Sequence, residues 1–180
     1  MNFKSFFIVK IFRLLFFSFL VLFLVVTAIS LFIPSHIRIS KAINISANTD
    51  SVFNQVNDPV KWKNWFPDLD SAKLYYDKGV VIGVIIDDSS QQYIKITGIT
   101  KDEVITELRA GSRKIISGWK IIDHSQPNST TLQWYMDFHL RWYPWEKFAS
   151  FLFEKSYGFI MEQGLNNIKK LAESDHTSSK

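Results

Sequence analysis

The chain has 180 residues and no Cys, with 47% hydrophobic residues, 21% charged residues and a formal net charge of +4. This length suits one domain with a short appendage, and the absence of Cys excludes a disulfide scaffold. Residues 1–35 hold Lys4, Lys10 and Arg13 and no acidic residue. The remainder, 21 − 3 = 18 basic against 17 acidic residues, is close to neutral. A nucleic-acid binder is therefore not expected, because phosphate binding needs a net basic footprint on the folded part.

The most apolar part of the sequence lies near its beginning. Leu14–Ile33 is a run of twenty residues without a charge. At 1.5 Å per residue, such a helix spans about 30 Å, which is the hydrocarbon thickness of a bilayer. Pro34 is a suitable terminator. We predict a transmembrane helix over residues 14–34, preceded by a cytoplasmic stub over residues 1–13.

A cleaved signal peptide is the alternative for this segment. Ala28 and Ser30 have the small-residue spacing that cleavage after Ser30 would need. The apolar run is longer than the roughly 7–15 residues of a signal h-region, which favours an uncleaved anchor. Three basic residues precede the helix, whereas Arg38 and Lys41 follow it, so the positive-inside bias is modest. We expect a single-pass membrane protein with a cytoplasmic N-terminus and an extracytoplasmic domain, in a bacterium at the inner membrane and in the periplasm.

The rest of the chain predicts an α+β domain. Alternating Ile residues predict a first strand over His36–Ala47, and N-cap residues at 48–50 predict a short helix over Ser51–Asp58. A second helical turn is expected at Val60–Pro67. Between Ala72 and Trp142, six short runs rich in Val, Ile, Tyr and Thr are separated by turn compositions, which predicts an antiparallel meander.

The last predicted strand has the clearest period of two. Its apolar parity consists of Thr130, Leu132, Trp134, Met136, Phe138, Leu140 and Trp142. Its other parity consists of Gln133, Tyr135, Asp137, His139 and Arg141 and is expected to face water. Pro144 then begins a helix that continues to about Ser174, with an expected kink near Gly158 and a disordered tail over residues 175–180.

This order of elements resembles the START-like, or SRPBCC, superfamily with its helix-grip fold. Val52–Pro67 is similar to the family's early pattern, Ser117–Trp134 to its paired late strands, and Gly164–Glu173 to its closing helix. The resemblance covers roughly residues 37–173 and suggests polyketide cyclase/dehydrase-like and lipid-transport-like proteins as relatives. It implies a curved antiparallel sheet wrapped around a long C-terminal helix over residues 36–174, here preceded by one transmembrane helix.

The resemblance also implies a cavity between the sheet and the helix for a hydrophobic or lipid-like small molecule. An apolar lining with few polar groups suits such a site. The candidates for its walls are Trp119, Trp134, Met136, Phe138, Phe151, Phe159 and Met161. Each of these residues also suits simple core packing, and Trp65 is expected to plug the space between the short helices and the sheet.

Patterns typical of catalysis or metal binding are scarce. The four His residues have no metal-ligand spacing, so no metal site is expected, and no cofactor fingerprint occurs. Asp87–Ser90 resembles a metal-binding cluster but is typical of a hairpin turn. Asp137, His139 and Arg141 share one face and suit either an acid–base set or a solvated surface of charge pairs.

Three functions therefore remain open. We favour a membrane-anchored binding module for a hydrophobic molecule. The second is a protein-interaction or envelope-structural module without a cavity. The third is a cyclase- or hydrolase-type enzyme, which would need an ionisable group from another strand, for instance Tyr93, Lys95 or Glu107.

Overall fold

The computed structural model describes residues 3–123 and 128–178. The described residues form two compact units. The first contains the chain up to Ile37 together with Leu140–Phe151, and the second contains Arg38–His139 and the chain from Leu152 onward. The predicted turn around His124 lies largely outside the described residues.

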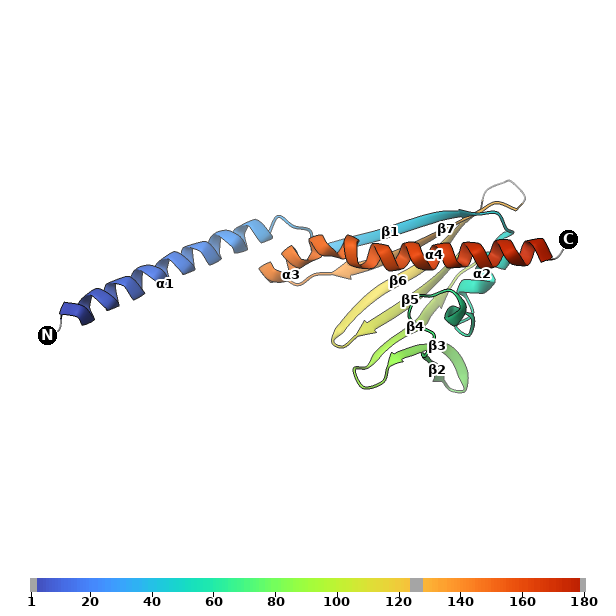
Figure 1. Cartoon of the computed structure of the whole chain (residues 1–180), viewed down its shortest axis with the longest axis horizontal. Helices are drawn as coiled ribbons and strands as arrows, with labels where there is room; N and C mark the ends of the chain where they lie inside the picture. The colour runs from blue at the N-terminus through green and yellow to red at the C-terminus, as the bar shows by residue number, and fades with distance from the viewer. Residues whose placement is uncertain (1–2, 124–127, 179–180) are drawn as a thin grey trace. The chain divides into compact units, whose positions relative to one another are not determined.

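The first unit is built on α1 (Phe3–Ser30), one uninterrupted helix in Figure 1. The helix begins earlier than the predicted span and ends before Pro34. Within it, Ile8–Ser30 has a mean hydropathy of 2.5, and 0% of its most apolar stretch of 18 residues is buried in the protein. By length and composition alone, α1 is a candidate membrane span. The same unit contains α3 (Pro144–Ala149), which has Pro at its first turn as predicted.

The second unit contains a seven-stranded sheet in the order β1-β7-β6-β5-β4-β3-β2. The strands are β1 (His36–Ile45), β2 (Lys73–Asp77), β3 (Val80–Asp87), β4 (Gln92–Ile99), β5 (Glu103–Ala110), β6 (Arg113–Asp123) and β7 (Thr130–His139). Each strand from β2 to β6 pairs antiparallel with the strand that follows it in the chain, which confirms the predicted meander. β7 ends at His139, so the prediction that Trp142 belongs to this strand is wrong.

Two short helices follow β1. Asn48 caps α2 (Thr49–Val56) through its side chain, which accepts a hydrogen bond from the Ser51 amide at 2.7 Å. The 3-10 helix η1 (Lys61–Asn64) comes next. The indole nitrogens at 62 and 65 donate to carbonyls of α2, Trp62 to Val56 at 2.9 Å and Trp65 to Gln55 at 3.0 Å. These bonds use carbonyls that the end of α2 leaves unpaired and fix η1 against it.

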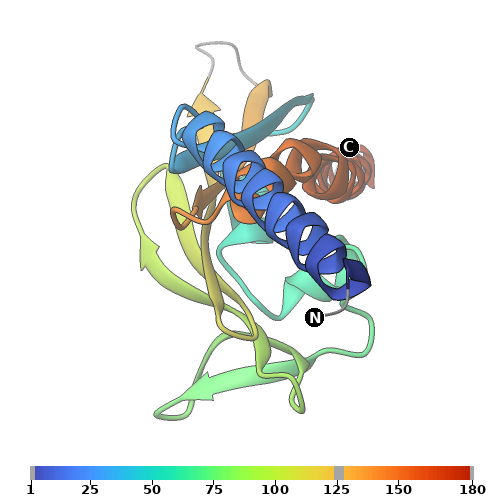
Figure 2. The ribbon, with the colours of Figure 1, turned by 90° about the vertical axis from the view of Figure 1, so that its left-hand side faces the viewer.

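The long C-terminal helix is α4 (Phe153–Ser178), and the 3-10 turn η2 (Ser150–Leu152) separates it from α3. The predicted single helix is therefore interrupted near Ser150 and is continuous at Gly158. Figure 2 shows α2 and α4 on the same side of the curved sheet. The α+β helix-grip architecture that we predicted is confirmed.

The concave face of the sheet carries the core. Register pairs place Leu74, Val84, Ile94, Leu108 and Ile115 side by side across five strands, β2 to β6. Val84, Ile94 and Ile115 are fully or almost fully buried. This row extends the apolar parity of β7 toward the far edge of the sheet.

The two glycines of α4 allow a direct test of how the helix packs. A Cβ at Gly164 would lie 2.7 Å from Cζ3 of the buried Trp134 and 3.3 Å from Cδ of Pro67. We expect Gly164→Ala to lower the free energy of unfolding by about 1–3 kcal/mol, since overpacking outweighs the gain in helix propensity.

Gly158→Ala is the matched control, because its nearest neighbours are flexible side-chain atoms, Lys41 Cε at 3.2 Å and Glu154 Oε1 at 3.4 Å. It should be neutral or stabilise by up to about 1 kcal/mol. Thermal unfolding of the full chain in detergent measures both variants, and equal effects would contradict a closer approach at Gly164.

Candidate functional site

Five aromatic side chains meet between the concave face of the sheet and the helices. Trp119 and Trp134 come from neighbouring positions of β6 and β7, and Trp62, Trp65 and Phe66 come from η1 and the residues after it. Neighbouring ring centroids are 5.0–6.4 Å apart. All four Trp residues are buried. We call this group the aromatic cluster.

The structure separates the predicted wall residues into two groups. Trp119, Trp134, Met136, Phe138 and Met161 are buried in the interior. Trp119 and Trp134 belong to the aromatic cluster, and Phe138 packs against Phe153 and Tyr157 of α4 at 4.7 Å and 4.8 Å between ring centroids. Phe151 and Phe159 lie on the surface, 68% and 69% exposed.

Helix phase explains the positions of these two residues. The buried stripe of α4 runs through Met161, Leu165, Ile168 and Ala172 at intervals of three and four residues. Phe159 is off that stripe, and Phe151 lies in η2, outside α4. The prediction placed the break in the helix near Gly158, whereas the structure places it at η2.

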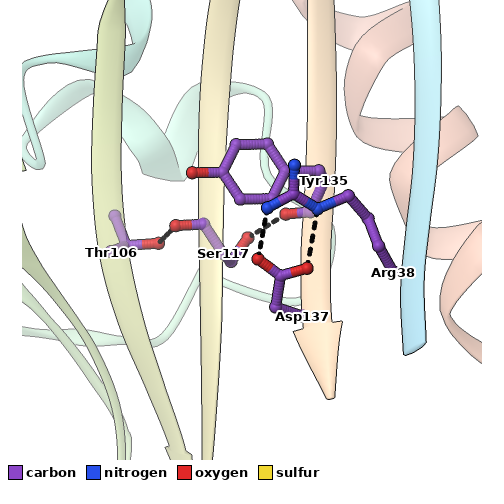
Figure 3. Close-up of polar contacts among 5 residues, drawn as sticks. All are labelled: Arg38, Thr106, Ser117, Tyr135 and Asp137. Carbon is purple, nitrogen blue, oxygen red and sulfur yellow. Dashed lines mark hydrogen bonds and ion pairs between the residues drawn. The ribbon is translucent and has the colours of Figure 1, made fainter. Parts of the chain in front are cut away.

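Figure 3 shows two buried hydroxyl residues on the strands, Thr106 and Ser117, and the hydrogen bonds that link them to neighbouring strands. Ser117 Oγ accepts from Trp134 Nε1 at 2.9 Å and donates to the Tyr135 carbonyl at 2.9 Å. Thr106 Oγ1 donates to the Ser117 carbonyl at 3.1 Å. Both hydroxyls are therefore engaged.

Trp119 differs from the other three Trp residues of the aromatic cluster. Its Nε1 is buried and is the one side-chain nitrogen or oxygen in the described part of the chain that is buried without a hydrogen-bond partner. An unpaired buried donor costs about 1–3 kcal/mol, and buried donors in native structures are normally satisfied by protein or water. The site thus offers one hydrogen-bond donor within apolar aromatic surroundings.

The opposite face of β7 carries an ion pair, shown in Figure 3, between Asp137, whose side chain is 10% exposed, and Arg38, whose side chain is 54% exposed. Arg38 donates from Nε and Nη2 to the two carboxylate oxygens of Asp137 at 2.7 Å and 2.6 Å. Its guanidinium carbon lies 4.4 Å from the ring centroid of Tyr135. The hydrogen bond that Arg38 donates to Asp137 is the main cause of a raised pKa for Arg38.

Burial raises the pKa of Tyr135 to about 12, and a hydrogen bond with Glu103 adds to this rise. A Cβ at Gly118 would lie 2.6 Å from the Tyr135 hydroxyl, so the glycine makes room for the ring. The prediction that this parity faces water is wrong at Tyr135 and Asp137, because β1 lies beside β7 and brings Arg38 over them.

Of the two possibilities considered for Asp137, His139 and Arg141, the arrangement does not support an acid–base set. Asp137 is engaged with Arg38, His139 is the exposed last residue of β7, and Arg141 lies beyond the strand. The Arg141 amide instead donates to Glu146 Oε2 at 2.7 Å.

A second polar group lies around Glu107. Its carboxylate accepts from the Tyr93 hydroxyl at 3.1 Å and lies 3.8 Å from Lys95 Nζ and 3.5 Å from Lys114 Nζ. Glu107 pairs with Lys95 and Ile116, whereas Val104 and Thr106 pair with Trp119 and Ser117. The ionisable residues considered for an enzyme therefore lie on the face of the sheet away from the aromatic cluster.

The Asp87–Ser90 segment forms a turn held by its own side chains. Asp87 accepts from the Ser89 amide at 3.0 Å and from the hydroxyls of Ser89 and Ser90 at 2.7 Å and 2.5 Å. These bonds, the one from Ser90 first, lower the pKa of Asp87 to about 2. Within residues 3–123 and 128–178, no group of three or more His, Cys, Asp or Glu is arranged to hold a metal ion.

Comparison with known proteins supports the fold. No family model and no curated protein matches the sequence. A START superfamily protein from Mycobacterium smegmatis aligns with a TM-score of 0.56 at 18% identity, over 76% of this chain and 97% of its own. A norcoclaurine synthase point mutant from Thalictrum flavum, in complex with a transition-state analogue, aligns with a TM-score of 0.59 at 13% identity, over 78% and 96%.

The di-domain aromatase/cyclase StfQ from the steffimycin biosynthetic pathway aligns with a TM-score of 0.60 at 8% identity, over 79% of this chain and 52% of its own. At these identities the likeness shows the fold alone. The chain therefore has a START-like fold, as the resemblance implied.

The ion pair between Arg38 and Asp137 predicts a stability difference. Replacing Arg38 by Met removes the guanidinium from the Asp137 carboxylate, which belongs to a residue only 7% exposed. We expect the free energy of unfolding to fall by about 1–3 kcal/mol. The control Lys73→Met removes the pair between Lys73 and Asp88, whose side chains are 75% and 76% exposed, and should cost less than about 1 kcal/mol. Denaturant unfolding compares the variants, and equal losses would argue against a stabilising role for the pair of Arg38 with Asp137.

Tyr135 predicts a stability loss at alkaline pH. Its pKa is about 12 in the folded protein against an ordinary value of 10.0, so the folded state keeps the proton longer than the unfolded state. The contribution is complete below pH 10 and is lost as the pH rises toward 12. The phenolate absorbance that is present in the wild type and missing in Tyr135→Phe should titrate near 12. A difference that titrates near 10 would contradict the burial effect.

Proposed function

We propose that this protein is a membrane-anchored START-like domain that binds a hydrophobic or lipid-like small molecule between the sheet and α4. The observation that carries the proposal is the buried, unpaired Nε1 of Trp119 within an apolar aromatic surrounding. Small-molecule sites combine mostly apolar walls with a few polar groups that orient the ligand. The ligand expected here has an apolar body and one hydrogen-bond acceptor, such as a carbonyl, ether or hydroxyl oxygen.

Two further observations support the proposal. The similar norcoclaurine synthase structure is described as a complex with a transition-state analogue, so that protein with the same fold holds a small molecule. The span Ile8–Ser30 has the length and hydropathy of a membrane anchor. We propose that this anchor keeps the domain at the membrane, a source of apolar ligands.

Binding is proposed in preference to catalysis. The Thr106 and Ser117 hydroxyls are both engaged in hydrogen bonds. The ionisable side chains of β4 and β5 considered above lie on the other face of the sheet. General acid–base chemistry needs an ionisable group within hydrogen-bond reach of the substrate, and these strands present theirs away from the aromatic cluster.

The competing function is an interaction or envelope-structural module without a cavity. The close ring packing of the aromatic cluster and the close approach of Gly164 to Trp134 favour it. The two functions differ in whether the purified protein carries a ligand.

Mass spectrometry of small molecules extracted from the purified full chain in detergent distinguishes them. The wild type should carry an apolar molecule, and Trp119→Phe should retain up to about tenfold less, because one hydrogen bond is lost while an aromatic ring is kept. Trp62→Phe is the matched control in the same cluster. Its indole hydrogen bond goes to Val56, so it should lower the unfolding temperature of ligand-free protein more than Trp119→Phe does.

Wild-type protein that is empty and binds nothing in a lipid screen would refute the proposal and support the module without a cavity. Equal ligand retention by the wild type and Trp119→Phe would remove the assigned role of Trp119.

A further inference from the structure

The segment Leu140–Phe151, which contains α3, has the reverse of the usual distribution of side chains. Within α3, Lys147 is 3% exposed, whereas Trp145 is 63% exposed. A helix facing water normally turns its charged residues outward and its apolar residues inward. In α3, Lys147 points inward and Trp145 points outward.

The charged side chains of α3 make bonds within the first unit. Lys147 Nζ donates to the Ile33 carbonyl and to Ser35 Oγ, both at 2.8 Å. Glu146 accepts from the Arg141 amide at 2.7 Å. A buried ammonium needs such acceptors, so these bonds explain how Lys147 can be buried.

The outer side of the segment is aromatic. Tyr143 stacks on Trp145 with ring centroids 4.8 Å apart and 6° between the planes, and Trp142 lies 4.9 Å from Tyr143. Phe148 and Phe151 make a further ring contact at 6.4 Å. We call these five residues the α3 aromatic surface. Except for the half-buried Tyr143, all of them are exposed.

This surface is fixed at the end of the candidate membrane span. The acceptors of Lys147 lie just after Ser30, where α1 ends. The Leu140 amide adds a second link by donating to the Ser35 carbonyl at 2.7 Å. Between the span and these links, the chain exposes the apolar side chain of Phe32, at 89%. Apolar exposure is therefore continuous from α1 to α3 within the first unit.

We propose that the α3 aromatic surface lies in the headgroup region of the same bilayer that α1 enters. The inference rests on the membrane anchor of the proposed function. A lipid surface is favoured as the occupant because the surface adjoins the end of the span. Its composition agrees, since Trp and Tyr prefer the membrane–water interface, where one end of the ring is apolar and the other is wet. The chain then has two points of attachment to one membrane, a spanning helix and an interfacial helix.

Fluorescence quenching by brominated lipid tests this inference on the full chain, reconstituted in phosphatidylcholine vesicles with and without bromine on the acyl chains. Of the six Trp residues, only Trp142 and Trp145 are exposed; the other four are buried. The wild type should be quenched by brominated lipid, and the double variant Trp142→Phe/Trp145→Phe should lose most of this quenching. Folding should be unaffected, because both side chains are exposed.

A second variant separates this inference from the anchor itself. Phe23→Trp, made in the double-variant background, places a fluorophore near the middle of the span Ile8–Ser30. The inference is supported if brominated lipid quenches this probe and also quenches the wild type more than the double variant. If the probe is quenched and the wild type is quenched no more than the double variant, the anchor stands and the interfacial position of α3 is overturned. If the probe is not quenched, the anchor fails and the inference fails with it.

Discussion

The indole of Trp134 is held from three sides. It donates to Ser117 Oγ at 2.9 Å, lies against Gly164 of α4, and packs 5.0 Å from the ring of Phe66. Neither the ring nor the helix can shift without breaking the hydrogen bond or opening a void, and interiors are packed too densely to absorb either change freely. The distance between the sheet and α4 is therefore set at this contact. The rest of the aromatic cluster fills the space that this distance leaves.

The indole hydrogen bonds of the aromatic cluster indicate which ring a ligand would contact in the proposed function. Trp62, Trp65 and Trp134 are each held by an indole hydrogen bond, to Val56, Gln55 and Ser117. The Trp119 ring contacts all four other members of the aromatic cluster, but its Nε1 has no such bond to a described residue. In the proposed function, a ligand would supply the acceptor that this N–H lacks. This makes Trp119 the most informative position to mutate.

Much of the second unit could be predicted from the sequence because its patterns are local. The alternation in β7 and the Asn48 cap need only neighbouring residues to be recognised, and all seven strands were predicted. The pairing of β1 with β7 is not local, so the burial of Tyr135 and Asp137 under Arg38 could not be derived from the alternation. That Trp119 Nε1 lacks a partner could not be predicted either, because it depends on which acceptors the tertiary fold brings within reach.

The prediction failed most around residues 140–152, and the failures share a cause. Trp142 was expected to face the concave side of the sheet, and Phe151 was expected to line a cavity, because both are large and apolar. These residues are exposed, while Lys147 is buried against Ile33 and Ser35. An apolar pattern shows which side chains avoid water, but it does not distinguish a protein interior from a lipid surface. In a segment tied to the end of a candidate membrane span, the proposed lipid surface would account for a charged side chain inside and aromatic rings outside.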